Sequence, residues 1–252
     1  GYNKYYMGAI NQKYTAMVPK GIHTMMAKPL AYLLNTKDDN RGKRFQAKRL
    51  LNAIDYSGNH YWDIISLGFA ANSLYDYLLP EFQIKNPFAF YKKTTGITSP
   101  KNLLEYRAID KVMSLEGDML VKVDRTSMLS SLECRAPFLN KKIWEFTNEL
   151  PQEFLMNGWN KKYILKDAFK REFPEGFLDK SKAGFGVPVG DWLRSLLKKE
   201  LETYIQPDFI KNQHIFDYNA ILKLVNDHLN GKDNTFMVWT YFCFQKWYTY
   251  RF

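Results

Sequence analysis

Five charged residues, Lys122 among them, stand in one largely apolar part of the sequence. The segment Met119–Leu132, M-L-V-K-V-D-R-T-S-M-L-S-S-L, has apolar side chains around most of a helix, so we expect this helix to be buried. Asp124 and Arg125 lie within it, and Glu133 and Arg135 follow in S-L-E-C-R-A-P-F-L-N. Buried charges need a partner or a ligand. Two interpretations stay open: the four residues pair in an internal network, or some of them form the floor of a polar pocket.

Two adjacent lysines open the segment N-G-W-N-K-K-Y-I-L-K-D-A-F. The pattern predicts a helix that begins after Asn157 or Gly158 and continues to about Arg171, with Lys161 and Lys162 in its first turn. The helix dipole favours negative charge there, and free backbone N–H groups beside a cation can bind an anion. An exposed lysine pair at a suboptimal helix end explains the pattern equally well. Helical phase does not choose between the two lysines.

A glycine-rich stretch follows, S-K-A-G-F-G-V-P-V-G-D-W-L, with Lys182 near its start. Glycines let a backbone approach a ligand closely, although an ordinary connection between helices has the same composition. Together with the lysine pair, this loop suggests a polyanion site. The sequence nevertheless contains no G-x-x-x-x-G-K-[ST], G-x-G-x-x-G, G-x-S-x-G or H-E-x-x-H. A phosphate site without a phosphate loop predicts that the chain is a fragment.

Helical periodicity dominates the sequence, and no alternating strand pattern or internal repeat interrupts it. We expect an all-α fold around one core over residues 1–252. The predicted helices are Tyr2–Met17, His23–Asn35, Lys43–Asp55, Trp62–Leu78, Asn102–Met113, Met119–Ser130, Lys141–Glu149, Trp192–Tyr204, Tyr218–Asn230 and a mostly apolar, buried Thr235–Trp247. Asp118 and Asn140 are predicted N-caps. Three prolines in Pro80–Pro100 predict a long irregular connection.

Composition limits the classes of function. The 252 residues are 46% hydrophobic and 16% aromatic, which argues against disorder. A net charge of +10 suggests an acidic partner, but the charge is dispersed and no nucleic-acid signature accompanies it. The two cysteines and four histidines are scattered, so no disulfide framework or local zinc motif is expected. No apolar run is long enough to span a membrane.

Three motifs in order resemble a known family. V-K-V-D-R-T-S-M-L-S-S-L-E-C-R-A-P-F-L-N resembles the V-K-V-D-R-x-S-M-x-x-S-L-E-x-R-x-P-F-L-D signature of glutamine-dependent asparagine synthetases. N-K-K-Y-I-L-K resembles the K-Y-I-L-R segment of that family, and K-A-G-F-G-V-P-V-G-D-W-L-R resembles its K-x-G-F-x-V-P-x-x-x-W-L block. The opening G-Y-N-K-Y resembles the sequence after the family's acidic loop. The resemblance runs from Gly1 to about Tyr204.

The resemblance implies a two-part enzyme, an ATP-dependent carbon–nitrogen ligase with glutamine as amide donor. A glutaminase domain supplies ammonia through a tunnel to an α/β synthetase domain of the ATP-pyrophosphatase type (adenine nucleotide alpha hydrolase-like). There ATP and Mg²⁺ activate aspartate as β-aspartyl-AMP, and ammonia gives asparagine, AMP and pyrophosphate. By this resemblance the chain is the helical C-terminal half of the synthetase domain, cytoplasmic, packed on an N-terminal portion of the same protein. Alone, it is expected to be inactive.

The resemblance also implies roles for individual residues. Lys162 matches the lysine expected to meet the pyrophosphate of ATP, and Lys182 is a second phosphate candidate. Tyr2 matches a tyrosine beside the acidic loop. The charged residues of the V-K-V-D-R and S-L-E-C-R segments, Asp124, Arg125, Glu133 and Arg135, become pocket wall or scaffold. No metal ligand is expected within the chain, because Mg²⁺ would be bound mainly elsewhere.

Three departures from the family pattern leave alternatives open. Cys134 replaces the usual alanine and is expected to be a small buried side chain, Ala136 replaces valine, and Asn140 replaces aspartate. The acceptor is therefore aspartate or, in a related amidotransferase, another carboxylate such as a sugar acid of a surface glycan. A non-catalytic basic helical binding module is the alternative of another class. The oligomeric state stays open.

Overall fold

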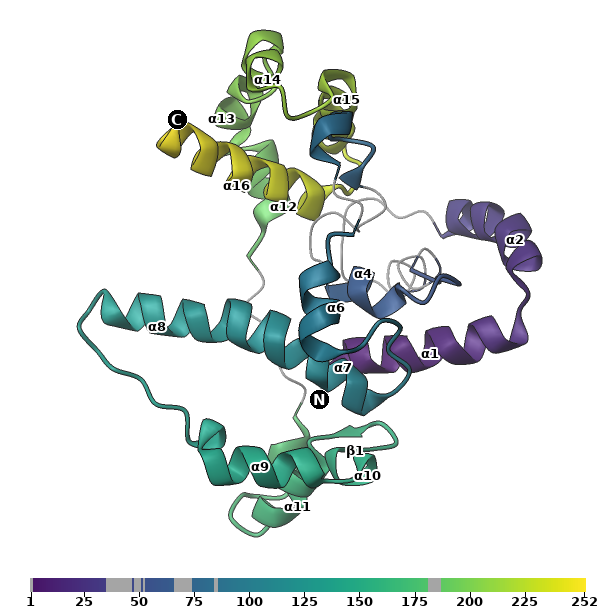
Figure 1. The fold of residues 1–252 in the computed structure, drawn as a ribbon, viewed down its shortest axis with the longest axis vertical. Coiled ribbons are helices and arrows are strands. Elements are labelled where there is room, and N and C mark those ends of the chain that lie inside the picture. The colour runs from purple at the N-terminus through teal and green to yellow at the C-terminus, as the bar shows by residue number, and fades with distance from the viewer. Residues whose placement is uncertain are drawn as a thin grey trace. The chain divides into compact units, whose positions relative to one another are not determined.

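The computed structural model describes residues 2–34, 47, 51, 53–65, 74–83, 86–180 and 187–252. The described residues are mostly helical (Figure 1), as the periodicity predicts. The chain divides into two compact units. Unit 1 comprises residues 1–13 and 90–184, and unit 2 comprises residues 14–89 and 185–252. Helix α1 (Asn3–Met17) contributes residues to both units.

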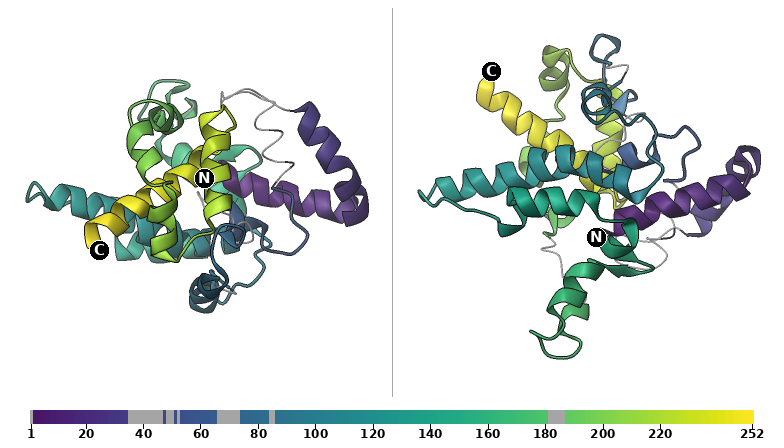
Figure 2. Two further views of the ribbon diagram at one scale, coloured as in Figure 1. Left: turned by 90° about the horizontal axis from the view of Figure 1, so that it is seen from above. Right: turned by 60° about the horizontal axis from the view of Figure 1, so that its bottom comes forward.

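Unit 1 is built around a continuous helical rod (Figure 1). Its consecutive parts are α7 (Leu103–Asp110), the ten-residue π-helix η2 (Lys111–Leu120) and α8 (Val121–Met128). Asn102 begins the rod as N-cap, because its side-chain oxygen accepts the N–H of Glu105 at 3.0 Å. The predicted break at Asp118 is wrong: the chain passes through it within the π-helix. Figure 2 shows the same teal rod from two further directions.

Most of the remaining elements of unit 1 follow the rod through an extended connection. The remaining elements are α6 (Ala89–Thr95), which precedes the rod, and then η3 (Pro137–Leu139), α9 (Lys141–Glu149), α10 (Gln152–Leu155), β1 (Met156–Asn157), β2 (Asn160–Lys161), α11 (Tyr163–Phe169) and η4 (Phe177–Asp179). The predicted N-cap at Asn140 is confirmed, since its side-chain oxygen accepts the N–H of Lys142 at 3.0 Å. Helix α6 lies where we predicted an irregular connection.

A short hairpin, which the helical periodicity does not predict, lies just before α11. Strands β1 and β2 pair antiparallel, with Met156 opposite Lys161. Gly158 turns the chain at φ 55°, a left-handed conformation that glycine adopts without steric cost. The hydroxyl of Tyr6 in α1 donates to the carbonyl oxygen of Gly158 at 2.9 Å, and the rings of Tyr6 and Trp159 lie 4.4 Å apart. These contacts hold the hairpin and so fix the start of α11.

A close approach joins α1 to α7 in unit 1. Gly8 is buried, and a Cβ atom at this position would lie 2.5 Å from the ring of Tyr106. Only a residue without a side chain therefore lets the tyrosine ring lie against α1. The contact brings the first residues of α1 beside the face of α7 that carries Asp110.

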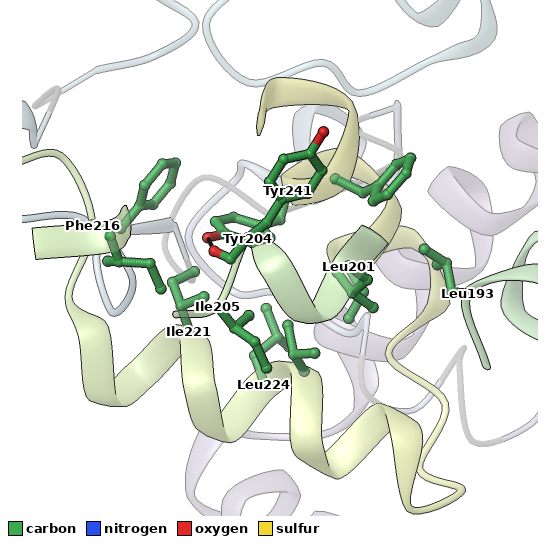
Figure 3. Packing of buried hydrophobic residues seen from close by; sticks show 12 residues of the cluster. Leu193, Leu201, Tyr204, Ile205, Phe216, Ile221, Leu224 and Tyr241 are labelled. Carbon is green, nitrogen blue, oxygen red and sulfur yellow. Dashed lines mark hydrogen bonds between the residues drawn. The ribbon is translucent and has the colours of Figure 1, made fainter. Parts of the chain in front are cut away.

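Unit 2 holds a cluster of buried apolar side chains. Its elements are α2 (Lys20–Leu33), α4 (His60–Ile65), η1 (Pro80–Phe82), α12 (Val189–Arg194), α13 (Lys198–Thr203), α14 (Pro207–Gln213), α15 (Tyr218–Leu229) and α16 (Thr235–Arg251). The last five elements build the cluster in Figure 3, which draws Leu193, Leu201, Tyr204, Ile205, Phe216, Ile221, Leu224 and Tyr241 with labels. Each fully buried aliphatic side chain contributes about 1.5–3 kcal/mol.

The C-terminal helices agree with the sequence in part. Helix α15 matches the predicted Tyr218–Asn230 closely. The predicted helix Trp192–Tyr204 is divided into α12 and α13, because the chain leaves helical geometry at Ser195. Helix α16 buries only one side, whereas Trp247 is 51% exposed. Most of the predicted helix Lys43–Asp55 and the middle of Trp62–Leu78 lie outside the described residues.

Candidate functional site

Lys162 occupies an unusual backbone position at the start of α11. Its φ of 58° and ψ of 38° are left-handed, a conformation that costs a non-glycine residue free energy and that is concentrated at functional positions. Lys162 is the N-cap residue but its side chain makes no capping hydrogen bond. The side chain is exposed, and within the described part of the chain its ammonium group makes no ion pair. The cation is therefore available to an anion.

Lys162 lines a cavity of about 710 Å³ that lies wholly within unit 1. The cavity is bounded by α1, the rod, α9, α10, β1 and α11. Its walls are mainly apolar and include Leu103, Leu115, Ile143, Trp144, Leu165 and Ala168. Tyr2, the residue expected beside the site, also lines it. The structure thus brings together Lys162 and Tyr2 at one cavity.

A buried carboxylate lies in the wall of the same cavity. Asp110 is 5% exposed. Its Oδ1 accepts from Lys4 Nζ at 2.5 Å and from Ser114 Oγ at 3.0 Å, and its Oδ2 accepts from Tyr5 Oη at 2.7 Å. Burial, followed by the negative charge of Asp110, raises the pKa of Tyr5 well above its ordinary value. Tyr5 therefore remains a protonated donor, and the carboxylate charge is compensated by Lys4.

Two further cations from the rod line the cavity. Arg107 and Lys111 lie four residues apart and thus on one helix face. Burial lowers the pKa of Arg107, and burial together with the nearby charge of Arg107 lowers the pKa of Lys111. The guanidinium of Arg107 donates to the carbonyl oxygen of Thr147 at 3.2 Å, and Lys111 Nζ contacts Asn148 Oδ1. Among the described residues, no carboxylate pairs with either cation.

Sequence reasoning did not identify the wall formed by α7 and η2. The signal was present, because Arg107, Asp110, Lys111 and Ser114 recur at spacings of three and four residues in a predicted helix. Such spacing places polar side chains on one face. The face was not recognised because its partner, the Lys4 and Tyr5 pair of α1, lies about a hundred positions away in the chain.

The helix of the V-K-V-D-R segment is not buried, contrary to the sequence prediction. Asp124 and Arg125 in α8 are exposed, and so is Val123 on the same helix. Neither charged side chain lines the cavity. The apolar side chains predicted a covered helix, but no described residues pack around α8 closely enough to bury any of its residues.

The segment after α8 is exposed as well. Glu133 and Arg135 form an ion pair with each other, with their side chains 65% and 87% exposed. They do pair, but at the surface, where such a pair contributes at most about 1 kcal/mol. This ion pair includes neither Asp124 nor Arg125, so the four residues do not form the predicted internal network. The expectation that Cys134 is buried is also wrong, since it is an exposed free cysteine.

Lys182 and most of its glycine-rich loop lie outside the described residues. In the part of the chain that the structure describes, no three histidine, cysteine, aspartate or glutamate side chains gather to hold a metal ion. We derive no step through Mg²⁺. Within the same residues, no helix has the length and apolar character needed to cross a lipid bilayer.

Comparisons with known proteins agree with the motifs. Glutamine-hydrolysing asparagine synthetase 1 of Bacillus subtilis is 30% identical over 171 residues, which cover 68% of this chain and 26% of that protein. A putative glutamine-hydrolysing asparagine synthetase of Mycobacterium tuberculosis H37Rv is 32% identical over 143 residues, or 56% of this chain and 22% of the relative. The chain thus spans about a quarter of the length of these curated relatives.

No solved structure matches the chain. The sequence profile of the family described as asparagine synthase matches residues 1–249, nearly the whole chain. Together with the V-K-V-D-R and K-Y-I-L motifs, this match shows that the chain belongs to the asparagine synthase family.

Proposed function

We propose that this chain is the helical C-terminal part of the synthetase domain of a glutamine-dependent asparagine synthetase. The intact protein would be an ATP-dependent carbon–nitrogen ligase that uses ATP, aspartate and glutamine-derived ammonia. Residues 1–252 would pack against an ATP-pyrophosphatase-type sheet that carries the ATP loop and lies elsewhere in the protein. Because the proposed reaction consumes ATP, we place the enzyme in the cytoplasm.

The observation that carries the proposal is the placement of Lys162. A family signature puts a lysine at this position, and its unpaired ammonium group lines the unit 1 cavity. When a carboxylate attacks the α-phosphorus of ATP, negative charge accumulates on the departing pyrophosphate. A cation fixed in advance on a helix start stabilises that charge without reorganisation. The left-handed backbone at Lys162 fixes the direction in which the side chain leaves α11.

The cavity walls supply the surroundings for this chemistry. The walls are mainly apolar, so a charge that they surround acts more strongly than it would in open solvent. Asp110, held by Lys4, Tyr5 and Ser114, keeps α1 fixed to the rod where Tyr2 enters the cavity. In the proposed mechanism this network holds the wall in place, and Lys162 contacts the leaving group.

The test uses the intact protein that contains this chain. Lys162→Ala should lower aspartate-dependent pyrophosphate release at least about 100-fold, the usual cost of removing one preorganised donor to a developing charge. Glutamine hydrolysis should persist. Lys142→Ala serves as matched control, because Lys142 is exposed on α9 and does not line the cavity.

Two results would contradict the proposal. Pyrophosphate release by Lys162→Ala at the rate of the Lys142→Ala control would show that Lys162 does not meet the leaving group. Pyrophosphate release by the wild-type protein without formation of asparagine, measured by chromatography of the products, would show that aspartate is not the acceptor. Lys162→Gly separates backbone from side-chain effects, because glycine accepts the left-handed conformation while the ammonium group is lost.

A further inference from the structure

The rod places two positive charges beside an apolar cavity without a matching negative charge. Arg107 and Lys111 are half-buried on one helix face and line the cavity. The one carboxylate in the described wall, Asp110, already accepts hydrogen bonds from Lys4, Ser114 and Tyr5. The charge of Asp110 is therefore compensated locally, and the two cations face the cavity in excess.

Each cation is held by neutral groups that fix its position. Arg107 donates to the carbonyl oxygen of Thr147 at 3.2 Å, which uses one of the five N–H donors of a guanidinium. Lys111 contacts Asn148, and its ammonium lies 4.5 Å from the ring centre of Trp144. Such contacts orient a cation but do not neutralise it. Two like charges kept close together in a partly buried wall repel each other, and an anion bound between them would remove that repulsion.

The small number of donors favours a small anion over a triphosphate. One carboxylate can lie between the two cations, because a guanidinium binds it through two parallel hydrogen bonds and the ammonium offers a further donor. ATP carries several negative charges and associated Mg²⁺, for which two cations set among Leu103, Leu115 and Trp144 offer too few polar contacts. Lys162 lies on a different element, α11, and is free for the phosphate chain.

We propose that Arg107 and Lys111 form a carboxylate subsite, separate from Lys162, that binds the α-carboxylate of the acceptor amino acid. This inference rests on the proposed function. It assigns the non-reacting carboxylate because the reacting one must keep an oxygen lone pair available to attack phosphorus. A carboxylate gripped by two cations is a weaker nucleophile. The α-carboxylate, in contrast, keeps its charge from binding to product release.

The kinetic consequence follows from that constancy of charge. An interaction that is equal in the ground state and the transition state affects KM and leaves kcat nearly unchanged. In the intact protein, Arg107→Gln should raise the KM for aspartate about 10- to 100-fold, the range expected for loss of a charge-assisted contact. The KM for ATP should stay within about twofold. Arg107→Lys keeps the charge but loses the two parallel hydrogen bonds, so its KM for aspartate should lie between those of the wild-type protein and Arg107→Gln.

The matched control is Arg171→Gln. Arg171 is exposed just after α11 and does not line the cavity, so the same substitution there should leave both KM values unchanged. A merely structural role of Arg107 would lower kcat and raise both KM values, and the Arg107→Lys variant would not rescue aspartate binding selectively. That pattern would overturn the subsite.

Direct binding separates this inference from the proposed function. The probe is L-aspartate, titrated calorimetrically into the intact protein without ATP. Arg107-dependent binding supports the subsite even if aspartate drives no pyrophosphate release, in which case only the proposed function fails. Normal turnover by the wild-type protein with an unchanged aspartate KM in Arg107→Gln overturns the subsite and leaves the proposed function intact. Absence of both aspartate binding and turnover in the wild-type protein overturns both.

Discussion

A pair of buried glutamines in unit 2 offers a sharp test of the packing described above. Gln213 of α14 and Gln245 of α16 are 9% and 0% exposed. Each side-chain amide donates to the other: Gln213 Nε2 to Gln245 Oε1 at 2.6 Å, and Gln245 Nε2 to Gln213 Oε1 at 3.0 Å. The two amides therefore satisfy each other inside the apolar cluster, and each depends on its partner.

The expected magnitudes come from that dependence. Gln213→Met or Gln245→Met alone keeps the side-chain volume but leaves one buried amide without both hydrogen bonds. Leaving a buried polar group unsatisfied costs about 1–3 kcal/mol, so each single variant should lose roughly 2–3 kcal/mol of unfolding free energy. The double variant replaces both amides with apolar groups of similar shape and should be nearly neutral. For a chain of this size, each single loss corresponds to a fall in Tm of about 4–12 °C.

The assay is thermal and urea unfolding of the wild-type protein, the two single variants and the double variant. The double-mutant cycle should give a coupling energy of at least about 2 kcal/mol. Additive losses, with the double variant the least stable of the four, would refute the reasoning. That result would mean that the two amides do not satisfy each other in solution, and that α14 and α16 are held together by apolar contacts alone.

Further predictions concern helix packing, capping and pH. Gly8→Ala should destabilise the protein by about 1–3 kcal/mol, because the new methyl group meets the Tyr106 ring. Gly21→Ala, in open space on α2, should stabilise it by about 0.5–1 kcal/mol. Equal shifts of Tm in the two variants would contradict this difference. Asn140→Asp keeps the cap and adds a negative charge at the start of α9, so urea unfolding should show a gain of about 0.3–1 kcal/mol that high salt removes. Burial and the charge of Arg107 lower the pKa of Lys111 from its ordinary value of 10.5. As the pH rises, Lys111 in the folded protein therefore loses its proton before an ordinary lysine does, with a midpoint below pH 10.5. The aspartate KM should rise with pH over this range below 10.5, and Lys111→Met should abolish the rise. Within the same range the unfolded chain binds the proton more strongly, so this group adds stability as pH rises.

Local signals in the sequence predicted much of the fold. Helix α15 and the cap at Asn140 depend on short-range features, apolar periodicity and one side-chain oxygen, and both were correct. The hairpin before α11 was missed because its strands have two residues each, too few to show an alternating pattern. The division between α12 and α13 was not predicted, because no glycine or proline marks the point at Ser195 where the helix ends.

In the candidate site, too, only the residues marked by a local sequence motif were predicted. Lys162 was predicted from a family motif, and it lines a cavity in the structure. Arg107 and Asp110 were not found, since their meaning depends on contacts with α1 far away in the sequence. The burial of Asp124 and Arg125 was predicted from the apolar residues beside them, and it was wrong because an apolar stripe does not reveal whether the chain supplies a partner for it.

The π-helical geometry of η2 gives the length of this segment a meaning of its own. A π-helix fits more residues into each turn than an α-helix does, so η2 carries extra backbone between the cavity wall and α8. Deleting one residue would let one turn of η2 close up as α-helix, and the helix that follows would keep nearly the same orientation, because a π turn holds about one residue more than an α turn. The same deletion within α7 or α8 would instead turn all that follows by about 100° about the rod axis. The π-helix thus gives the rod one place where it can lose a residue without changing where the side chains of the V-K-V-D-R segment face.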